Sequence, residues 1–193
     1  VSMTTLSKRA QAFPSSPIRK LMPQAIAAKA RGVTVHHVNI GQPDVATPPM
    51  VLDALRNYEP TTIAYAQSGG NPGYVDALHR YYAGLGHDLP KGGIMATTGG
   101  SEAIIFAFLT AMDPGDEILV PEPFYTNYNT MAQVAGCSIQ AVTTHGRDGF
   151  HLPDEATLEA AITPRTRAIL LCNPSNPTGT VYTRSEVDTI AAL

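Results

Sequence analysis

Residues 168–179 read Ala-Ile-Leu-Leu-Cys-Asn-Pro-Ser-Asn-Pro-Thr-Gly, and this stretch decides the fold. Its apolar first part predicts a buried strand over 167–172. Two Asn-Pro steps and a glycine then end regular structure, and each asparagine is held extended by the proline after it. The sequence therefore predicts a stiff loop at the carboxyl end of a parallel strand, where open α/β sheets bind ligands. The Asn176 amide could donate there to an anionic oxygen, although a proline-rich segment can also be a turn and nothing more.

Strand and helix patterns alternate along the second half of the chain. Apolar runs predict strands over 94–98, 117–121, 138–143 and 167–172. Helices are predicted between and after them, over 101–112, 126–135, 154–162 and from Thr183 onward with no stop signal. Such alternation is typical of a mainly parallel sheet with helices on both faces, an α/β fold of three α/β/α layers. The first half predicts helices over 16–32 (bent at Pro23), 48–57 and 74–85, and a short strand over 35–40.

Composition excludes several classes of protein. Of 193 residues, 44% are apolar and 15% are charged, which indicates a globular chain and not a disordered one. The net charge of −3 gives no reason to expect nucleic acid or an anionic membrane as a partner. The two cysteines, Cys137 and Cys172, lie far apart without metal-binding spacing, so we expect free thiols in a cytoplasmic protein. No apolar run approaches the roughly 18 residues of a membrane span, and no signal peptide precedes Met3.

A glycine-rich turn precedes the helix expected over 101–112. Residues 97–102 read Thr-Thr-Gly-Gly-Ser-Glu. Glycines let the backbone approach a ligand, and a helix start offers unpaired N–H groups and a positive dipole end, which suit a phosphate. A tight turn with Ser101 as N-cap explains the same residues. The turn is neither a Walker loop, because no Gly-Lys-Ser/Thr follows, nor a Gly-x-Gly-x-x-Gly fingerprint.

Two other features call for an interpretation. Residues 121–125 read Pro-Glu-Pro-Phe-Tyr and follow a predicted strand, so an aromatic side chain there could stack on a flat heteroaromatic ring. A half-buried core aromatic is the alternative. The adjacent His36 and His37 suggest a metal, but a strand would point them to opposite faces, so we expect both to be structural and no metal site.

Four motifs, in order along the chain, resemble those of the class I and II aminotransferases, which share the aspartate aminotransferase fold and use pyridoxal phosphate (PLP). They are Gly-Gln-Pro-Asp at 41–44, the 97–102 turn, the 121–125 segment and Asn-Pro-Ser-Asn-Pro-Thr-Gly at 173–179. The resemblance runs from about Ser16 to Leu193 but covers only the first half of the family's length. It implies that residues 1–45 contribute to a small domain and that residues 46–193 begin the large PLP-binding domain.

The resemblance also implies roles for individual residues at the cofactor. Gly100, Ser101 and Glu102 would contact the PLP phosphate. Tyr125 would stack on the pyridine ring. Asn176 would donate to the phenolic oxygen of the ring and to the substrate carboxylate.

Further matches concern the substrate, a second subunit and the catalytic lysine. Gly41 would offer its backbone N–H to the substrate carboxylate. Tyr65 would reach the cofactor phosphate of the neighbouring subunit, which implies a homodimer. The family's Schiff-base lysine is expected beyond Leu193, because none of the lysines here lies in a matching context; they are Lys8, Lys20, Lys29 and Lys91.

The implied activity is transfer of an amino group between an L-amino acid and a 2-oxo acid by the full-length protein. A PLP-dependent carbon–sulfur lyase of the same fold is one alternative. A non-enzymatic regulator with an aminotransferase-like domain is another, but the roughly 15 residues before Ser16 are too few for a DNA-binding module. A phosphate- or nucleotide-binding module is the third, and the lack of a ribose-binding acidic residue after a glycine motif argues against it.

Overall fold

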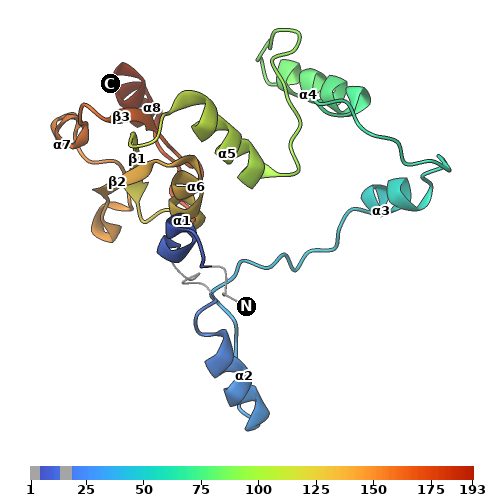
Figure 1. Ribbon diagram of the computed structural model, residues 1–193, viewed down its shortest axis with the longest axis horizontal. Helices are drawn as coiled ribbons and strands as arrows, with labels where there is room; N and C mark the ends of the chain where they lie inside the picture. The colour runs from blue at the N-terminus through green and yellow to red at the C-terminus, as the bar shows by residue number, and fades with distance from the viewer. Residues whose placement is uncertain (1–4, 14–18) are drawn as a thin grey trace. The chain divides into compact units, whose positions relative to one another are not determined.

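The structure is a computed structural model that describes residues 5–13 and 19–193, and it divides into two compact units (Figure 1). One unit combines the described residues before 34 with Gly100–Leu193, and the other is Thr34–Gly99. No helix in the described ranges is both long and apolar enough to cross a membrane.

The first unit contains a parallel sheet of three strands in the order β2-β1-β3. The strands are β1 (Glu117–Glu122), β2 (Ser138–Thr143) and β3 (Thr166–Ile169). Both pairings are parallel, which confirms the predicted kind of sheet. Regular β3 ends earlier than the predicted 172, although Leu170 N still donates to Leu119 O at 2.9 Å.

Helices cover both faces of this sheet, as the sequence predicts (Figure 1). They are α5 (Gly100–Ala111), α6 (Asn127–Ala135), α7 (Glu155–Ala161) and α8 (Arg184–Ala192). Side chains of α5 and α6 form one apolar core with the sheet. Side chains of α7 and α8 form the second core on the opposite face. The three-layer α/β/α arrangement is therefore present, with the sheet incomplete.

The central strand β1 contributes to both cores, because successive residues of a strand point to opposite faces. Ile118 and Val120 pack with α5 and α6, whereas Leu119 packs with Leu158 of α7. Ile118 and Leu119 are fully buried. At about 25 cal/mol per Å² of apolar surface, each such side chain stabilises the fold by about 2 kcal/mol.

Local signals set several helix ends. Asp154 is the N-cap of α7, since its side chain accepts from Thr157 N at 2.9 Å. Gly136, with φ of 83°, ends α6 in the left-handed conformation that a side chain would disfavour. Thr183 and Glu186 form a reciprocal capping box at the start of α8.

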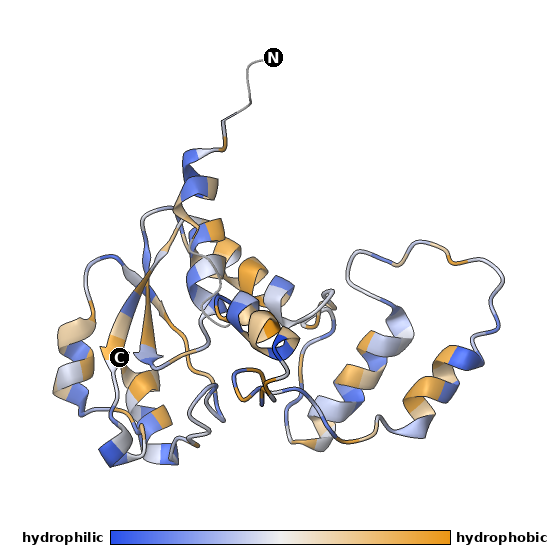
Figure 2. Ribbon diagram, turned by 90° about the horizontal axis from the view of Figure 1, so that it is seen from below, coloured by the Kyte–Doolittle hydropathy of each residue, from blue (hydrophilic) through white to orange (hydrophobic). Residues whose placement is uncertain are grey.

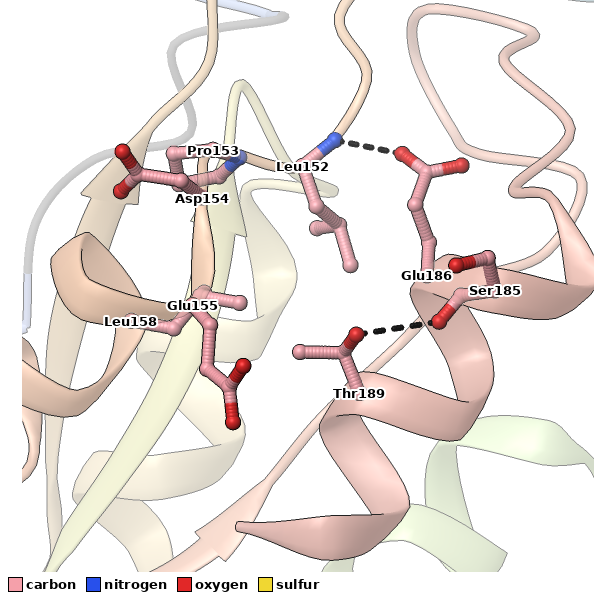
Figure 3. A pocket seen from close by; sticks show the side chains of 8 residues that line it. All are labelled: Leu152, Pro153, Asp154, Glu155, Leu158, Ser185, Glu186 and Thr189. Atoms are coloured by element: carbon pink, nitrogen blue, oxygen red, sulfur yellow. Dashed lines mark hydrogen bonds between the residues drawn. The ribbon is translucent and has the colours of Figure 1, made fainter.

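The start of α8 is also joined to the loop before α7, around a hollow of about 120 Å³ (Figure 3). Leu152 N donates to Glu186 Oε1 at 2.8 Å, and the His151 ring nitrogen lies 3.1 Å from the same carboxylate. Burial raises the pKa of Glu186, but hydrogen bonds from Thr183, Leu152 and His151 outweigh it and bring the pKa to about 2. These bonds fix the chain just after the Asn-Pro-Thr-Gly loop.

The N-terminal helices differ from the prediction. A short helix that the sequence pattern did not predict, α1 (Lys8–Ala12), begins after the N-cap Ser7. The helix expected over 16–32 is α2 (Met22–Ala30), and residues 16–18 lie outside the described ranges. The expectation of a bend at Pro23 is wrong, because Pro23 occupies the first turn, where a missing N–H costs no hydrogen bond.

The second unit contains the two predicted helices, α3 (Pro49–Arg56) and α4 (Pro72–Gly84), each with hydrophobic and hydrophilic residues (Figure 2). Neither predicted strand is present: residues 35–40 and 94–98 are irregular. A strand needs a partner along its length, whereas Ala96 N donates to Gly69 O at 3.0 Å without a ladder forming around it. Within the described residues, no group of three or more His, Cys, Asp or Glu side chains could hold a metal ion.

Candidate functional site

The segments that follow β1 and β3 leave the same edge of the sheet. The two strands are adjacent and parallel, so their carboxyl ends coincide. Tyr125 lies shortly after β1, and Asn176 lies in the loop after β3. Two of the side chains expected to contact one cofactor therefore extend from neighbouring strands at the edge where α/β sheets bind ligands.

The N-terminus of α5 is directed toward this same edge. A short turn over 112–116 links α5 to β1, so helix and strand run in opposite directions, and Phe108 near the helix end packs with Ile118 near the strand start. The 12 residues of α5 rise about 18 Å. The six residues of β1 span about 20 Å, so Gly100–Glu102 lies level with the carboxyl ends of the strands.

The start of α5 has the features of an anion site. The helix begins at Gly100, so Ser101 is its second residue and does not act as the N-cap that a simple turn would require. The first N–H groups of any helix have no intrahelical acceptor and carry the positive end of the helix dipole. A Cβ atom at Gly100 would meet nothing within 4 Å, so the space beside this glycine is open. Ser101 is exposed, and Glu102 is half-buried.

Tyr125 is half-buried and is held from two sides. Asn127 Nδ2 donates to the Tyr125 hydroxyl oxygen at 2.6 Å. The Tyr128 ring packs against the Tyr125 ring edge-on, with centroids 5.4 Å apart and an angle of 87°. Phe124 packs against the core and stacks on Tyr128, with centroids 6.3 Å apart. These contacts restrain the plane of the Tyr125 ring, which a stacking platform requires.

The two asparagines in the loop after β3 differ in their contacts: Asn176 is exposed, and Asn173 hydrogen-bonds within the protein. Ser175 N donates to Thr180 O and Gly179 N donates to Ser175 O, both at 2.8 Å, which closes the loop around Asn176. Asn176 is exposed, and nothing in the described part of the chain hydrogen-bonds its amide. Asn173 Oδ1 instead accepts from Tyr182 N at 3.1 Å.

Sequence reasoning did not identify the residues that support this loop. The buried Thr180 donates from Oγ1 to Gly149 O at 2.8 Å, which ties the loop to the segment between β2 and α7. Its partner is distant in sequence, so no local pattern marks it. The sequence does show an Asn-Pro step at Asn173. Such a step does not reveal whether the asparagine supports the loop or binds a ligand.

Gly41 and Tyr65, the other predicted site residues, belong to the Thr34–Gly99 unit and are described within it alone. The Tyr65 side chain is fully exposed there. A Cβ atom at Gly41 would meet nothing within 4 Å. Both positions are therefore accessible in their own unit.

Comparison with known proteins places this site in a family. The family model for aminotransferase class I and II matches residues 34–193. The aspartate/prephenate aminotransferase of Thermus thermophilus is 33% identical over 193 residues, which is 99% of this chain and 50% of that protein. The aspartate aminotransferase of Streptomyces avermitilis is 34% identical over 188 residues, 96% of this chain and 46% of that protein.

Solved structures give the same result. A single mutant of Thermus thermophilus aspartate aminotransferase superposes with a TM-score of 0.89 at 32% identity, over 98% of this chain and 50% of that one. An alanine aminotransferase from Pyrococcus furiosus gives a TM-score of 0.87 at 30% identity, over 97% of this chain and 49% of that one. The chain belongs to the class I and II aminotransferase family. It spans about half the length of the curated relatives it matches.

Proposed function

We propose that the complete protein is a PLP-dependent aminotransferase that moves an amino group between an L-amino acid and a 2-oxo acid. The observation that carries this proposal is the convergence of Gly100–Glu102, Tyr125 and Asn176 on one edge of the sheet. The names of the relatives, which are aspartate and alanine aminotransferases, support it.

The chemistry of these groups fits PLP part by part. A phosphate can accept hydrogen bonds from the backbone N–H groups of Gly100, Ser101 and Glu102 and from the Ser101 hydroxyl. Glu102 would contribute its backbone N–H, because its carboxylate would repel a phosphate. The restrained Tyr125 ring offers an aromatic face to the pyridine ring. The Asn176 amide can donate to the phenolic oxygen of the cofactor and to a substrate carboxylate. PLP, when bound, supplies the electron sink for the reaction.

The proposal assigns the remaining roles to residues outside this edge. The Schiff-base lysine lies beyond Leu193, because this chain spans about half the length of its relatives and none of its own lysines matches. Gly41 binds the substrate carboxylate through its backbone N–H. Tyr65 reaches the cofactor phosphate of a second subunit, and its full exposure supports a homodimer with shared sites.

Domain organisation and cellular location belong to the same proposal. Residues 1–45 contribute to a small domain, and residues 46–193 begin the large PLP-binding domain, which the sheet within Gly100–Leu193 supports. The protein acts in the cytoplasm. The free state of Cys137 and Cys172 is consistent with a reducing compartment.

A half-reaction tests the function. The full-length protein with PLP is mixed with one L-amino acid and no 2-oxo acid, first L-aspartate and then L-alanine. An aminotransferase releases the matching 2-oxo acid once per site, and the visible band of the cofactor disappears until a 2-oxo acid is added. Continuous release of ammonia and pyruvate from a sulfur-containing amino acid, without this stoichiometric step, would instead identify a carbon–sulfur lyase.

A further inference from the structure

The segment that joins β2 to α7 contains a turn with a left-handed backbone. Gly149 has a φ of 65°, and Phe150 has a φ of 59°. This region is unfavourable for a residue with a side chain, so Phe150 keeps it only because its contacts determine it. Phe150 N donates to His145 O at 3.0 Å, and a Cβ atom at Gly146 would lie 3.2 Å from the Phe150 ring. The Gly149–Phe150 turn is therefore closely held within its own segment.

The chain after β3 holds the same segment at two further points. Thr180 Oγ1 donates to Gly149 O at 2.8 Å. Farther along, Leu152 N donates to Glu186 Oε1 at 2.8 Å (Figure 3). Both bonds join parts of the chain that are distant in sequence. The first of them starts only a few residues after Asn176, in the same loop.

Every polar group of Thr180 is used, and the residue is only 8% exposed. Its backbone oxygen accepts from Ser175 N at 2.8 Å, and its N–H donates to Thr178 Oγ1 at 3.3 Å. Its hydroxyl accepts from the Thr178 hydroxyl at 2.9 Å and donates to Gly149 O. The two hydroxyls thus form a directed row that begins in the Asn-Pro-Thr-Gly motif and ends on the Gly149–Phe150 turn.

The loop needs this contact because its internal bonds do not locate it. The bonds from Ser175 N to Thr180 O and from Gly179 N to Ser175 O close the loop on itself. Regular pairing of β3 ends at Ile169, so the sheet does not extend to the Asn176 amide. The loop could otherwise shift as a closed unit, and a misplacement of about 1 Å at a ligand-binding group is enough to lower catalysis substantially.

We propose that Thr180 is a positioning residue that fixes the direction of the Asn176 amide by fastening its loop to the Gly149–Phe150 turn. The inference rests on the proposed function and deepens it, because it gives a role to a segment to which we assign no contact with the cofactor. Thr180 itself is buried and fully paired, so it acts through Asn176 and not by touching PLP.

The substitution Thr180→Val in the full-length protein tests the inference, because valine keeps the shape of the side chain and removes the hydroxyl. We expect PLP to bind to the apoenzyme about fivefold more weakly, the effect of one lost hydrogen bond. The pH at which the visible band of bound PLP titrates should rise, as for Asn176→Ala, because the phenolic oxygen is left with a poorly directed donor. Thr180→Ser keeps the hydroxyl and should restore both values.

A double variant shows whether the effect passes through Asn176. Thr180→Val combined with Asn176→Ala should bind PLP no more weakly than Asn176→Ala alone, because the amide that Thr180 positions is already absent. Fold-changes that multiply would overturn the inference. Hydrogen exchange of peptides covering 173–182 in the apoprotein gives a readout without the cofactor, and it should be faster in Thr180→Val and unchanged in Thr180→Ser.

Thr144→Val is the matched control for loss of a buried hydroxyl. Thr144 is also 8% exposed, and its Oγ1 donates to Glu122 O at 2.8 Å, which is the same kind of bond at the same length. Thr144 N still donates to Glu122 O at 2.9 Å, so the end of β1 remains tied in this variant. It should lower the urea midpoint and leave the titration of the PLP band unchanged. If Thr144→Val shifts that titration as much as Thr180→Val, the effect is general destabilisation and the inference is wrong.

Failure of the inference can be told from failure of the proposed function. If the unsubstituted protein does not bind PLP, the proposed function falls and the inference falls with it. If it binds PLP but Thr180→Val leaves affinity, titration and hydrogen exchange unchanged, only the inference is overturned. Should Thr180→Val not fold, Thr180→Ala decides by the same measurements, because it places no methyl group against the Gly149 carbonyl.

Discussion

The Glu186 carboxylate offers a sharp test of how the start of α8 is held. It accepts hydrogen bonds from Thr183 N and Thr183 Oγ1, both at 2.7 Å, and from Leu152 N at 2.8 Å. In Glu186→Gln one of the two oxygens becomes an NH₂ group, so the donors on one side lose their acceptor. A backbone N–H left unpaired costs about 1–3 kcal/mol, and the 17% exposure of the side chain argues for the middle of that range, about 2 kcal/mol.

The effect should depend on pH in a defined direction. The pKa of Glu186 falls from 4.5 to about 2 in the folded protein. A lowered pKa stabilises the fold fully above about pH 4.5, and this contribution is lost as pH falls toward 2. The difference between the unsubstituted protein and Glu186→Gln should therefore be full at pH 7 and smaller at pH 3.

Urea unfolding of the full-length protein at both pH values, followed by far-ultraviolet circular dichroism, measures this difference. Hydrogen exchange at the Leu152 and Thr183 amides shows whether the loss is local. Asp188→Asn on the same helix is the control, because its ion pair with Arg184 is exposed and contributes less than about 1 kcal/mol. A Glu186→Gln protein as stable as Asp188→Asn at pH 7, or a difference that grows on acidification, would refute the reasoning.

Three other substitutions test the site and the core. Asn176→Ala should shift the visible absorbance of bound PLP and raise the pH at which that band titrates, because the phenolic oxygen loses a donor; an unchanged titration curve contradicts this role. Ser101→Ala should weaken PLP binding by about 1 kcal/mol in equilibrium dialysis, the effect of one hydrogen bond to an anion, and equal affinity would remove the assignment. Leu158→Ala should lower the free energy of unfolding by about 2–5 kcal/mol, since this side chain is 1% exposed between α7 and the sheet; a loss below about 1 kcal/mol would count against a packed second core.

The parts of the fold that carry local signals could be predicted from the sequence. The strand over 138–143 was predicted with the bounds that the structure shows, because Ile139, Ala141 and Val142 lie in a short segment between Gly136 and Gly146. The helix expected over 154–162 was likewise close to the structure, where α7 covers Glu155–Ala161 and Asp154 is its N-cap. The strands expected over 35–40 and 94–98 were wrong because an apolar run indicates only that a segment suits a strand. Whether a strand forms depends on a partner, and the Thr34–Gly99 unit provides none among its described residues.

The same division applies to the site. Ser101, Tyr125 and Asn176 stand in motifs whose residue order carries the signal, so the sequence indicated them. The supporting residue Thr180 acts through its hydrogen bond to Gly149, which lies far away along the chain. No spacing rule connects such a pair, because the packing of the loops on the sheet brings the two residues together. The role of Thr180 became apparent only from the three-dimensional arrangement.

The central claim is that this chain holds the cofactor at the carboxyl edge of its sheet. A crystal structure of the full-length protein with PLP tests it most directly. We expect the phosphate within hydrogen-bonding distance of the Ser101 hydroxyl and the N–H groups at the start of α5, the ring stacked on Tyr125, and the Asn176 amide at the phenolic oxygen. A phosphate bound away from α5, or a ring that touches neither Tyr125 nor Asn176, would contradict the account.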